Sequence, residues 1–315
     1  MKLAIDAMGG DNGPLNNIKG VKLALAELPE NIKLVLVGNE SELKPLLQKE
    51  DLNSDRVEIF HAEEVIPMGA HPTKALTKMP KASIPVGYHL LKTGDIDAFS
   101  SCGNTGAMLV GAMFSIHAIE GVIRPGIASL MPKEKGGYGI LMDVGANADV
   151  KPDVLVQFAE IASIYARNVL KIVNPRVGLI NLGEEEQKGT LLTQSAHQLL
   201  KINSKINFIG NIEGRDLFND KADVMVCDGF VGNVLLKFAE SIYDMLQQRS
   251  FRDSFFDTMD YRAIGGSPIL GVNGNVVIGH GVSDPEAVKN MLLQSYRMAV
   301  SNVHIEIKEK LSNNL

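Results

Sequence analysis

Five glycine-containing turns hold the residues of this chain whose types and spacing best suit chemistry. Each follows a short apolar run and combines Gly with Asp, Asn or Ser; they span residues 6–11, 101–106, 143–147, 181–185 and 228–233. Glycine permits positive φ and a close approach of the backbone to a ligand. Backbone N–H groups freed at such turns can bind an anion. We therefore predict that the turns form one site for a phosphate-bearing substrate.

The turn 101–106 is the first choice for the phosphate itself. It leads directly into a predicted helix over 107–116, which Asn104 or Thr105 would cap. The predicted phosphate-binding residues are Ser101, Gly103, Asn104, Thr105 and Gly106. The alternative is that Gly and Asn only turn the chain here. Neither the P-loop pattern nor the GxGxxG pattern occurs, which disfavours nucleotide binding of those two types.

Further turn residues are expected to line the same cleft. They are Asp6, Gly9, Gly10, Asp11, Asn147 and Asp228. Carboxylates would repel a phosphate unless a cation intervened. Of the strand-end aspartates, which include Asp143, we therefore expect at least two to brace or cap a neighbouring loop.

Three residues are candidates for a catalytic role. His280 stands between two glycines after the predicted strand 276–278 and could move a proton near neutral pH, or make a structural hydrogen bond. Lys188 could bring positive charge to the ligand, or be simply solvated. Asn233 lies at the start of a predicted helix. Residues 184–186, all Glu, are expected to form a solvated first helical turn.

The two cysteines do not have the spacing expected for metal binding or thiol chemistry. Cys102 and Cys227 are far apart, and no CxxC or HExxH pattern occurs, so neither a cysteine-rich zinc site nor a disulfide framework is expected. Cys102 lacks an assigned base, which favours a small buried filler over a nucleophile. We expect no metal and no cofactor.

The elements that position these turns alternate along the chain. Short apolar runs and longer segments of helical period follow one another, which is typical of a mainly parallel sheet with helices on both faces. The predicted strands are 3–6, 34–37, 57–60, 97–101, 127–131, 140–143, 177–181, 206–209, 223–227 and 276–278. We predict one α/β catalytic unit over 1–315, with two subdomains as an open alternative, and an irregular excursion over 247–274.

Four helices are clearest in the sequence. Pro14 and Pro152 open two of them, and the last spans roughly 284–307. One begins near Asn233 and is expected to bury an apolar face comprising Val234, Leu235, Phe238, Ile242, Met245 and Leu246.

Charge and hydropathy limit the function classes. The chain has 315 residues with 31 Lys and Arg against 37 Asp and Glu, a net charge of −6, which argues against a general nucleic-acid binder. The N-terminus does not resemble a signal peptide. No window has the roughly 18 uninterrupted apolar residues that suggest a membrane span. We expect a cytoplasmic protein.

The motifs together resemble those of a known family. DAMGGD at 6–11, SCGNTGA at 101–107, DVGAN at 143–147, GNIEGRD at 210–216 and CDGFVGNVLLK at 227–237 are similar to the bacterial phosphate acyltransferases of phospholipid synthesis, the PlsX family. LGEE with Lys188 and Gly189, GGSPILGV at 265–272 and the His-Gly pair at 280–281 extend the match over nearly the whole chain. Ile264, Ser267 and the segment KASIPV depart from the family pattern.

The resemblance implies a homodimer with a fold related to isocitrate and isopropylmalate dehydrogenases and to phosphotransacetylases. It implies transfer of a long-chain acyl group from acyl carrier protein to inorganic phosphate. The acyl phosphate would feed a membrane glycerol-3-phosphate acyltransferase. Phosphate is then the nucleophile, so no Ser-His-Asp arrangement is needed.

Two surface features suggest partners. Lys74, Lys78 and Lys81 lie in a segment without acidic residues and would align on a helix, which predicts a docking patch for the acidic carrier protein; an ordinary solvated face is the alternative. Residues 251–259 contain three Phe and Met259 at helical spacing. We expect these to be buried in a dimer interface, with transient contact to a membrane surface as the second possibility.

Three rival functions stay open. The nearest is a phosphate acetyl- or butyryltransferase that uses coenzyme A. A decarboxylating NAD-dependent dehydrogenase would need an aspartate metal cluster and an arginine-rich site, and Arg124 and Arg215 are the only arginines in plausible loops. A non-catalytic scaffold for lipid synthesis is hard to reconcile with so many glycine-built turns.

Overall fold

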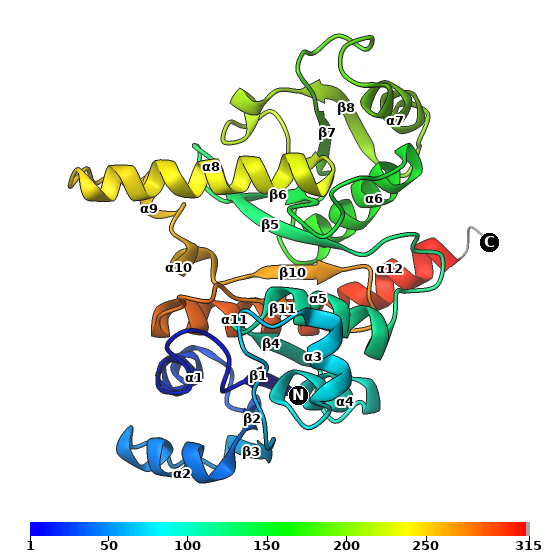
Figure 1. The fold of residues 1–315 in the computed structure, drawn as a ribbon. Helices are drawn as coiled ribbons and strands as arrows, with labels where there is room; N and C mark the ends of the chain where they lie inside the picture. The colour runs from blue at the N-terminus through cyan, green and yellow to red at the C-terminus, as the bar shows by residue number, and fades with distance from the viewer. Residues whose placement is uncertain (313–315) are drawn as a thin grey trace. The chain divides into compact units, whose positions relative to one another are not determined.

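The computed structural model of the protein describes residues 1–312 and consists of two compact units (Figure 1). Unit 1 contains Met1–Ala118 and Tyr261–Val300. Unit 2 contains Ile119–Asp260 and the chain from Ser301 onward. The chain therefore leaves the first unit, forms the second, and returns to the first before its C-terminal helix.

The sheet of unit 1 is mainly parallel. Its strand order is β3 (Val57–His61), β2 (Lys33–Gly38), β1 (Lys2–Asp6), β4 (Ala98–Ser101), β11 (Asn275–Ile278) and β10 (Ser267–Leu270). All neighbours pair in parallel except β10 and β11. The residues of β1 from Leu3 to Ile5 are fully buried, as expected for a strand covered on both faces.

Helices cover both faces of this sheet. Adjacent residues of a strand point to opposite faces. In β4, Phe99 packs against Gly87 of α4 (Ser83–Thr93), whereas the Ser100 hydroxyl lies 2.6 Å from that of Ser295 in α11 (Pro285–Ser301). The other helices of unit 1 are α1 (Leu15–Glu27), α2 (Glu40–Lys49), α3 (Pro72–Lys78), α5 (Thr105–Gly111) with the π-helix Ala112–Ile116, and α10 (Tyr261–Ile264).

The strands of unit 2 are also mainly parallel. The order is β5 (Gly126–Pro132), β6 (Tyr138–Met142), β9 (Val224–Val226), β7 (Arg176–Ile180) and β8 (Asn207–Ile212), and only β5 and β6 pair antiparallel. The helices are α6 (Pro152–Asn168), α7 (Leu191–Lys201), the 3-10 helix Gly214–Asp216, α8 (Gly229–Gln248), α9 (Ser254–Asp257) and α12 (Val303–Ser312).

All ten predicted strands are present, and one strand was missed. The strand β10 begins at Ser267 and contains Pro268, and it lies inside the segment 247–274 that was predicted as an irregular excursion, so the last part of that prediction is wrong. The prediction also ended β8 too early, at 209. Gly210 has a φ of +98° and lies beside a register shift at Val177 and Gly178, so the strand continues past a bulge.

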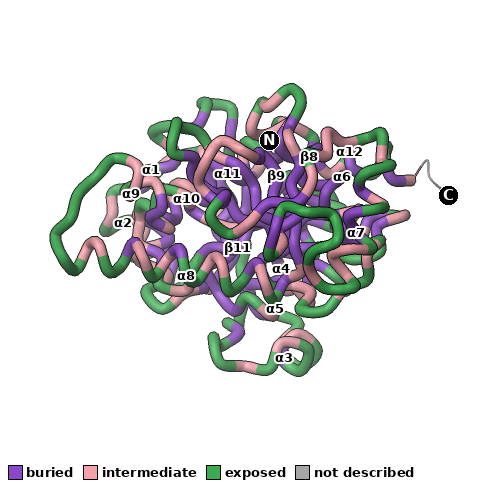
Figure 2. Tube along the Cα trace, turned by 90° about the horizontal axis from the view of Figure 1, so that it is seen from above, coloured by how far each residue is buried: buried purple, intermediate pink, exposed green. Residues whose placement is uncertain are grey.

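The predicted helix near Asn233 differs from the observed α8 in two ways. It begins four residues earlier, at Gly229, because Asp228 caps it by accepting a hydrogen bond from the Val231 N–H. None of the six residues of its expected buried face is buried: Leu235, Ile242 and Leu246 are half-buried, and Val234, Phe238 and Met245 have exposed fractions of 53%, 63% and 49%. Figure 2 shows α8 mostly in the colours of exposed and intermediate residues.

The predicted terminal helix is broken in two. Asn302 has a φ of +49° between α11 and α12, which ends the first helix. Among the residues that the structure describes, no helix is both long and apolar enough to cross a membrane.

Candidate functional site

A buried carboxylate ties the first two turns of unit 1 together. Asp6 is 1% exposed, and its carboxylate accepts hydrogen bonds from the Ser101 hydroxyl at 2.7 Å and the Gly9 N–H at 3.1 Å. Burial raises the pKa of Asp6, although these hydrogen bonds oppose the shift. Asp6 thus braces the loops, as predicted for at least two of the aspartates.

Glycine is required at two positions of the first turn. A Cβ on Gly9 would lie 2.4 Å from a carboxylate oxygen of Asp6 and 2.8 Å from the Gly103 nitrogen. Gly10 has a φ of +95°. The turns at 6–11 and 101–106 therefore touch each other through backbone atoms.

The turn that carries His280 joins them. The Gly279 N–H donates to the Ser101 carbonyl at 2.9 Å, and the Asp11 N–H donates to the Gly281 carbonyl at 2.8 Å. His280 is exposed, and its ring centroid lies 5.3 Å from that of Tyr261. Three turns of unit 1 thus form one cluster, which we call the unit 1 turn cluster.

Asn17 of α1 is a residue of this cluster that the sequence analysis missed. Its side-chain amide is buried and donates to the carbonyls of Ala7 and Gly9, both at 2.9 Å. A polar residue beside Ile18, within the buried part of an amphipathic helix, was the available signal. Asn17 therefore fixes the first turn to helix α1.

The side chains of the phosphate-turn candidates divide into two groups. Ser101 donates to Asp6 and accepts from the Gly103 N–H at 2.9 Å. The Asn104 amide donates to three carbonyls of the loop 67–70 and its oxygen caps α5 at the Ala107 N–H. Both are therefore used inside the protein, whereas Thr105 is exposed and Gly106 is half-buried.

Cys102 is a buried filler. It is 1% exposed, and burial raises the pKa of its thiol to about 12. A thiol that stays protonated at neutral pH is a poor nucleophile.

Two turns of unit 2 form a second cluster, here called the unit 2 turn cluster. The carboxylate of Asp143 is fully buried and accepts from the N–H groups of Gly145, Ala146 and Asn147. The Gly229 N–H donates to the Asn147 carbonyl at 2.7 Å. The amide of Asn233 donates to the Val144 carbonyl at 3.1 Å, which connects the start of α8 to the same turn.

The turn that carries Lys188 differs from its prediction. Residues 184–186 are exposed but not helical, because α7 begins only at Leu191, where Thr190 caps it. Lys188 is exposed, and its carbonyl accepts a hydrogen bond from the Asn181 amide at 3.1 Å.

One group of three carboxylates could geometrically hold a cation. Among the described residues, Glu184, Glu213 and Asp216 bring their oxygens within 4.8 Å of one another. The ammonium of Lys221 already lies 2.6 Å from Glu184 and 3.0 Å from Asp216. This group is therefore balanced by a protein cation.

The comparisons with known proteins decide the family. The family described as "Fatty acid synthesis protein" matches residues 1–255. The phosphate acyltransferase of Dictyoglomus turgidum is 41% identical over 332 aligned positions that cover 99% of this chain and 98% of the relative. The chain belongs to this family. It is therefore an acyl-transferring enzyme, as the motifs predicted.

Solved structures confirm the fold class of this acyltransferase. A phosphotransacetylase from Streptococcus pyogenes has a TM-score of 0.70 at 16% identity, covering 95% of this chain and 94% of the other. A branched-chain phosphotransacylase from Enterococcus faecalis has a TM-score of 0.62 at 16% identity, covering 94% and 99%. Identities this low show the fold alone.

The lysines predicted to bind a carrier protein do not all lie on one helix of the acyltransferase. Lys74 and Lys78 are exposed on α3. Lys81 lies beyond the end of that helix, and its ammonium pairs with Glu63 at 2.8 Å. The expected alignment of three lysines is therefore wrong, and two remain.

The phenylalanine segment is only partly exposed. Phe251 is 50% exposed, whereas Met259 is 6% exposed and belongs to the core. Phe255 stacks edge-on against Phe218 and Phe256, with ring centroids 6.0 and 5.4 Å apart. Phe251 is therefore the member of this segment that is available to a partner.

Proposed function

We propose that this acyltransferase moves a long-chain fatty acyl group from acyl carrier protein to inorganic phosphate and releases acyl phosphate for phospholipid synthesis. The observation that carries the proposal is the similarity, over nearly the full length of both chains, to phosphate acyltransferases. No cofactor is required, because phosphate is itself the nucleophile. The turn clusters supply what this chemistry needs, namely a rigid backbone that can orient an anion.

The unit 1 turn cluster supports phosphate binding at 101–106. Asp6, Ser101 and Asn17 fix the backbone from within, so the loop does not have to be ordered by the ligand. The first N–H groups of a helix lack intrahelical partners. The N–H groups of Thr105 and Gly106 and the exposed hydroxyl of Thr105 are the donors that we assign to phosphate.

The reaction forms one bond and breaks one. A phosphate oxygen attacks the thioester carbonyl carbon, and the C–S bond breaks as the thiolate of the carrier leaves. That thiol has an ordinary pKa of about 8.5, so a proton donor assists only modestly. We assign this donor to His280, which is exposed in the same cluster.

The unit 2 turn cluster and the Lys188 turn are assigned to the thioester. Lys188 would offset the charge that develops on the carbonyl oxygen, and Asn233 and Asn147 would contribute amide dipoles. Asp228 and Asp143 then hold this backbone in place.

A direct assay tests the function. The protein is incubated with phosphate and either palmitoyl-carrier protein or palmitoyl-coenzyme A, and acyl phosphate is trapped with hydroxylamine. We expect product from the carrier ester. Product from the coenzyme A ester alone would favour the rival function, a phosphate acetyl- or butyryltransferase that uses coenzyme A. The similarity of the fold to that of a phosphotransacetylase is the reason for testing this rival. No product from either ester would contradict the proposal.

Partners follow from the same proposal. Lys74 and Lys78 would dock the acidic carrier protein, and no nucleic acid is involved. We propose a homodimer that works in the cytoplasm and touches the membrane transiently, where glycerol-3-phosphate acyltransferase takes the product. Phe251 is the residue that we assign to membrane contact. Liposome flotation of the wild type against Phe251→Ser tests this assignment, and equal flotation would contradict it.

A further inference from the structure

An apolar pocket in unit 1 is not used by the steps described above. It has a volume of about 280 Å³ and lies between α3, α4, α5 and the π-helix. Leu76, Pro85, Val110 and Phe114 form its apolar walls. None of the described residues that line it carries a charge.

Two hydroxyls around the pocket are already paired. The Thr77 hydroxyl donates to the Thr73 carbonyl at 2.9 Å, which uses its hydrogen within α3. At Gly111 the wall is the ring of Tyr88: a Cβ on this glycine would lie 2.5 Å from a ring carbon. Tyr88 is fully buried, and its hydroxyl donates to the Met108 carbonyl. The pocket therefore suits an apolar chain better than a charged ligand.

The rim of the pocket is an exposed aromatic ring held by a fixed backbone. Phe114 is 69% exposed in the π-helix, a rare conformation that is frequent at functional sites. His117, which ends the π-helix, has a φ of +62°. The Asn273 amide donates to the carbonyls of Ile116, His117 and Ala118 and so fixes this end.

The pocket lies on the helix that starts at the proposed phosphate turn. At that turn Gly106 packs against Pro72 of α3, where a Cβ would lie 2.4 Å from the proline ring. Val110 follows four residues later, about 6 Å further along α5. The proposed phosphate turn and the pocket are therefore about one helical turn apart along α5.

We infer that this pocket binds the alkyl chain of the acyl group during transfer. The inference rests on the proposed function and adds to it the place in unit 1 that takes the alkyl chain of the donor. The amide-rich arm of the carrier would leave its polar groups unpaired here, which is unfavourable. A methylene chain has no polar groups and therefore loses no hydrogen bonds when it enters the pocket.

The expected signature is a dependence on chain length. Each methylene that enters an apolar site strengthens binding about fourfold until the pocket is full. The affinity should therefore be at least two orders of magnitude higher for a dodecyl than for a butyl chain. This gain corresponds to the burial of about four to five methylenes.

Alkyl phosphates test the inference without turnover. Butyl phosphate and dodecyl phosphate, the latter below its micelle concentration, are titrated calorimetrically into the full-length protein. Val110→Phe fills the pocket and should reduce the dodecyl-to-butyl affinity ratio at least tenfold. Val173→Phe makes the same change at a position that is 90% exposed and should leave the ratio as in the wild type. Leu76→Phe narrows the pocket from the other wall if the first variant is unstable.

The assay separates this inference from the proposed function. A wild-type affinity ratio in both Val110→Phe and Leu76→Phe would overturn the pocket assignment, even if acyl phosphate is formed. A ratio that falls in these variants, in a protein that forms acyl phosphate from no donor, would support the pocket and refute the function. In an active enzyme, the kcat/KM ratio of dodecanoyl to butyryl donors should fall with the affinity ratio.

Discussion

The contrast between Ser101 and Thr105 illustrates how one turn divides structural and ligand-binding roles. The Ser101 hydroxyl bridges Asp6 and the Gly103 N–H in a fully buried position. Removing it leaves both partners unsatisfied, so Ser101→Ala should lower the free energy of unfolding by about 1–3 kcal/mol. Thr105→Ala removes an exposed hydroxyl and should leave stability unchanged within about 0.5 kcal/mol, but raise the KM for phosphate. Urea unfolding and initial rates measure the two effects; equal stability of the two variants would contradict the division.

Gly9 permits the contact between the first two turns. Gly9→Ala places a methyl 2.4 Å from Asp6 and 2.8 Å from the backbone of Gly103, so one of the loops must move. We expect a lower melting temperature and a loss of acyl phosphate formation of at least tenfold. Gly69→Ala is the matched control, because nothing lies within 4 Å of its added Cβ. Wild-type activity in Gly9→Ala would show that the turns need not touch.

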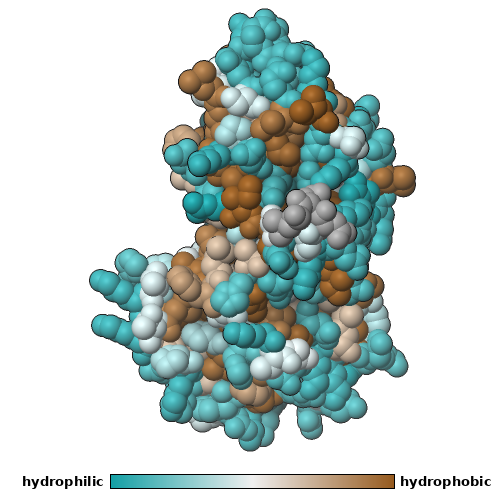
Figure 3. All heavy atoms as spheres, turned by 90° about the vertical axis from the view of Figure 1, so that its right-hand side faces the viewer, coloured by the Kyte–Doolittle hydropathy of each residue, from teal (hydrophilic) through white to brown (hydrophobic). Residues whose placement is uncertain are grey.

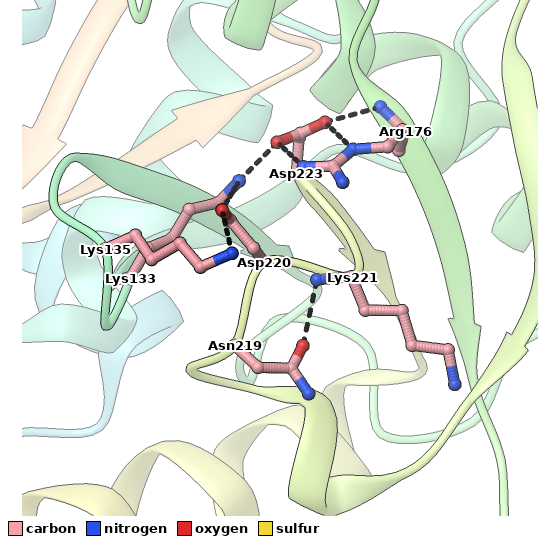
Figure 4. Close-up of polar contacts among 7 residues, drawn as sticks. All are labelled: Lys133, Lys135, Arg176, Asn219, Asp220, Lys221 and Asp223. Carbon is pink, nitrogen blue, oxygen red and sulfur yellow. Dashed lines mark hydrogen bonds and ion pairs between the residues drawn. The ribbon is translucent and has the colours of Figure 1, made fainter.

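An ion cluster around Asp223 couples stability to pH (Figure 4). Its carboxylate is paired with Lys133 and accepts from the Arg176 guanidinium at 2.9 Å. Burial opposes ionisation, but these hydrogen bonds outweigh it and lower the pKa of Asp223 to about 2. A depressed pKa stabilises the fold above the unfolded value near 4, and this contribution is lost as the pH falls from about 4 to about 2.

Substitution of Asp223 tests this coupling. Asp223→Asn should cost about 3 kcal/mol at pH 7, because it leaves the buried Lys133 with only the more distant Asp220 at 3.7 Å. The variant should also lose part of the acid dependence of its unfolding free energy. Asp220→Asn, at a side chain that is 40% exposed, should cost less than about 1 kcal/mol. Parallel acid profiles of Asp223→Asn and the wild type would refute the assigned pKa shift.

At the scale of elements, α3 carries the proposed carrier-docking charge. Lys74→Glu combined with Lys78→Glu reverses four units of charge on one exposed helix, so the KM for acyl-carrier protein should rise at least fivefold at low salt. The effect should shrink as ionic strength rises. Lys44→Glu on α2, where the lysine pairs with Glu40, changes charge elsewhere and serves as the control. A KM that stays the same in the double variant would leave these lysines as an ordinary solvated face.

The sequence predicted the positions of helices and strands better than it predicted which surfaces are buried. Continuous apolar runs identified β1 and β2, because strands buried on both faces contain little else. The apolar period of α8 was equally clear, yet periodicity does not say whether the covering surface belongs to the same chain. The three glutamates at 184–186 were predicted to be helical because acidic residues are favoured in the first turn of a helix. The helix α7 begins later instead, where the Thr190 hydroxyl accepts a hydrogen bond from the Thr193 N–H and caps it.

The candidate site could be predicted only in part for a related reason. The residue types identified the turns, since Gly next to Asp or Asn favours a turn and this preference can be recognised in the sequence alone. They did not show that Ser101 and Asn104 are used internally, because those hydrogen bonds reach residues far along the chain, such as Asp6 and Pro67. Asn17 was missed because its amide bonds to Ala7 and Gly9, which lie outside its own helix.

At the scale of the whole molecule, the exposed face of α8 is the surface that best suits the proposed homodimer. Phe230, Val234 and Phe238 recur at every fourth residue with exposed fractions of 65%, 53% and 63%, which aligns them along one stripe of the helix. By contrast, the face drawn in Figure 3 is largely hydrophilic, and its apolar atoms form separate groups. A contiguous apolar stripe on a long helix marks an interaction site.

We expect this stripe to form the core of the proposed homodimer. Phe238→Asp would bury a charge without a partner at the interface, so the dimer should dissociate at least a hundredfold more readily. Sedimentation equilibrium over a range of concentrations measures this change. Ile123→Asp introduces the same charge at another side chain, 53% exposed and outside α8, and should leave the dimer intact. If Phe238→Asp sediments as the wild type does, the stripe is not the core of the dimer, because a buried unpaired carboxylate could not leave a dimer interface unweakened.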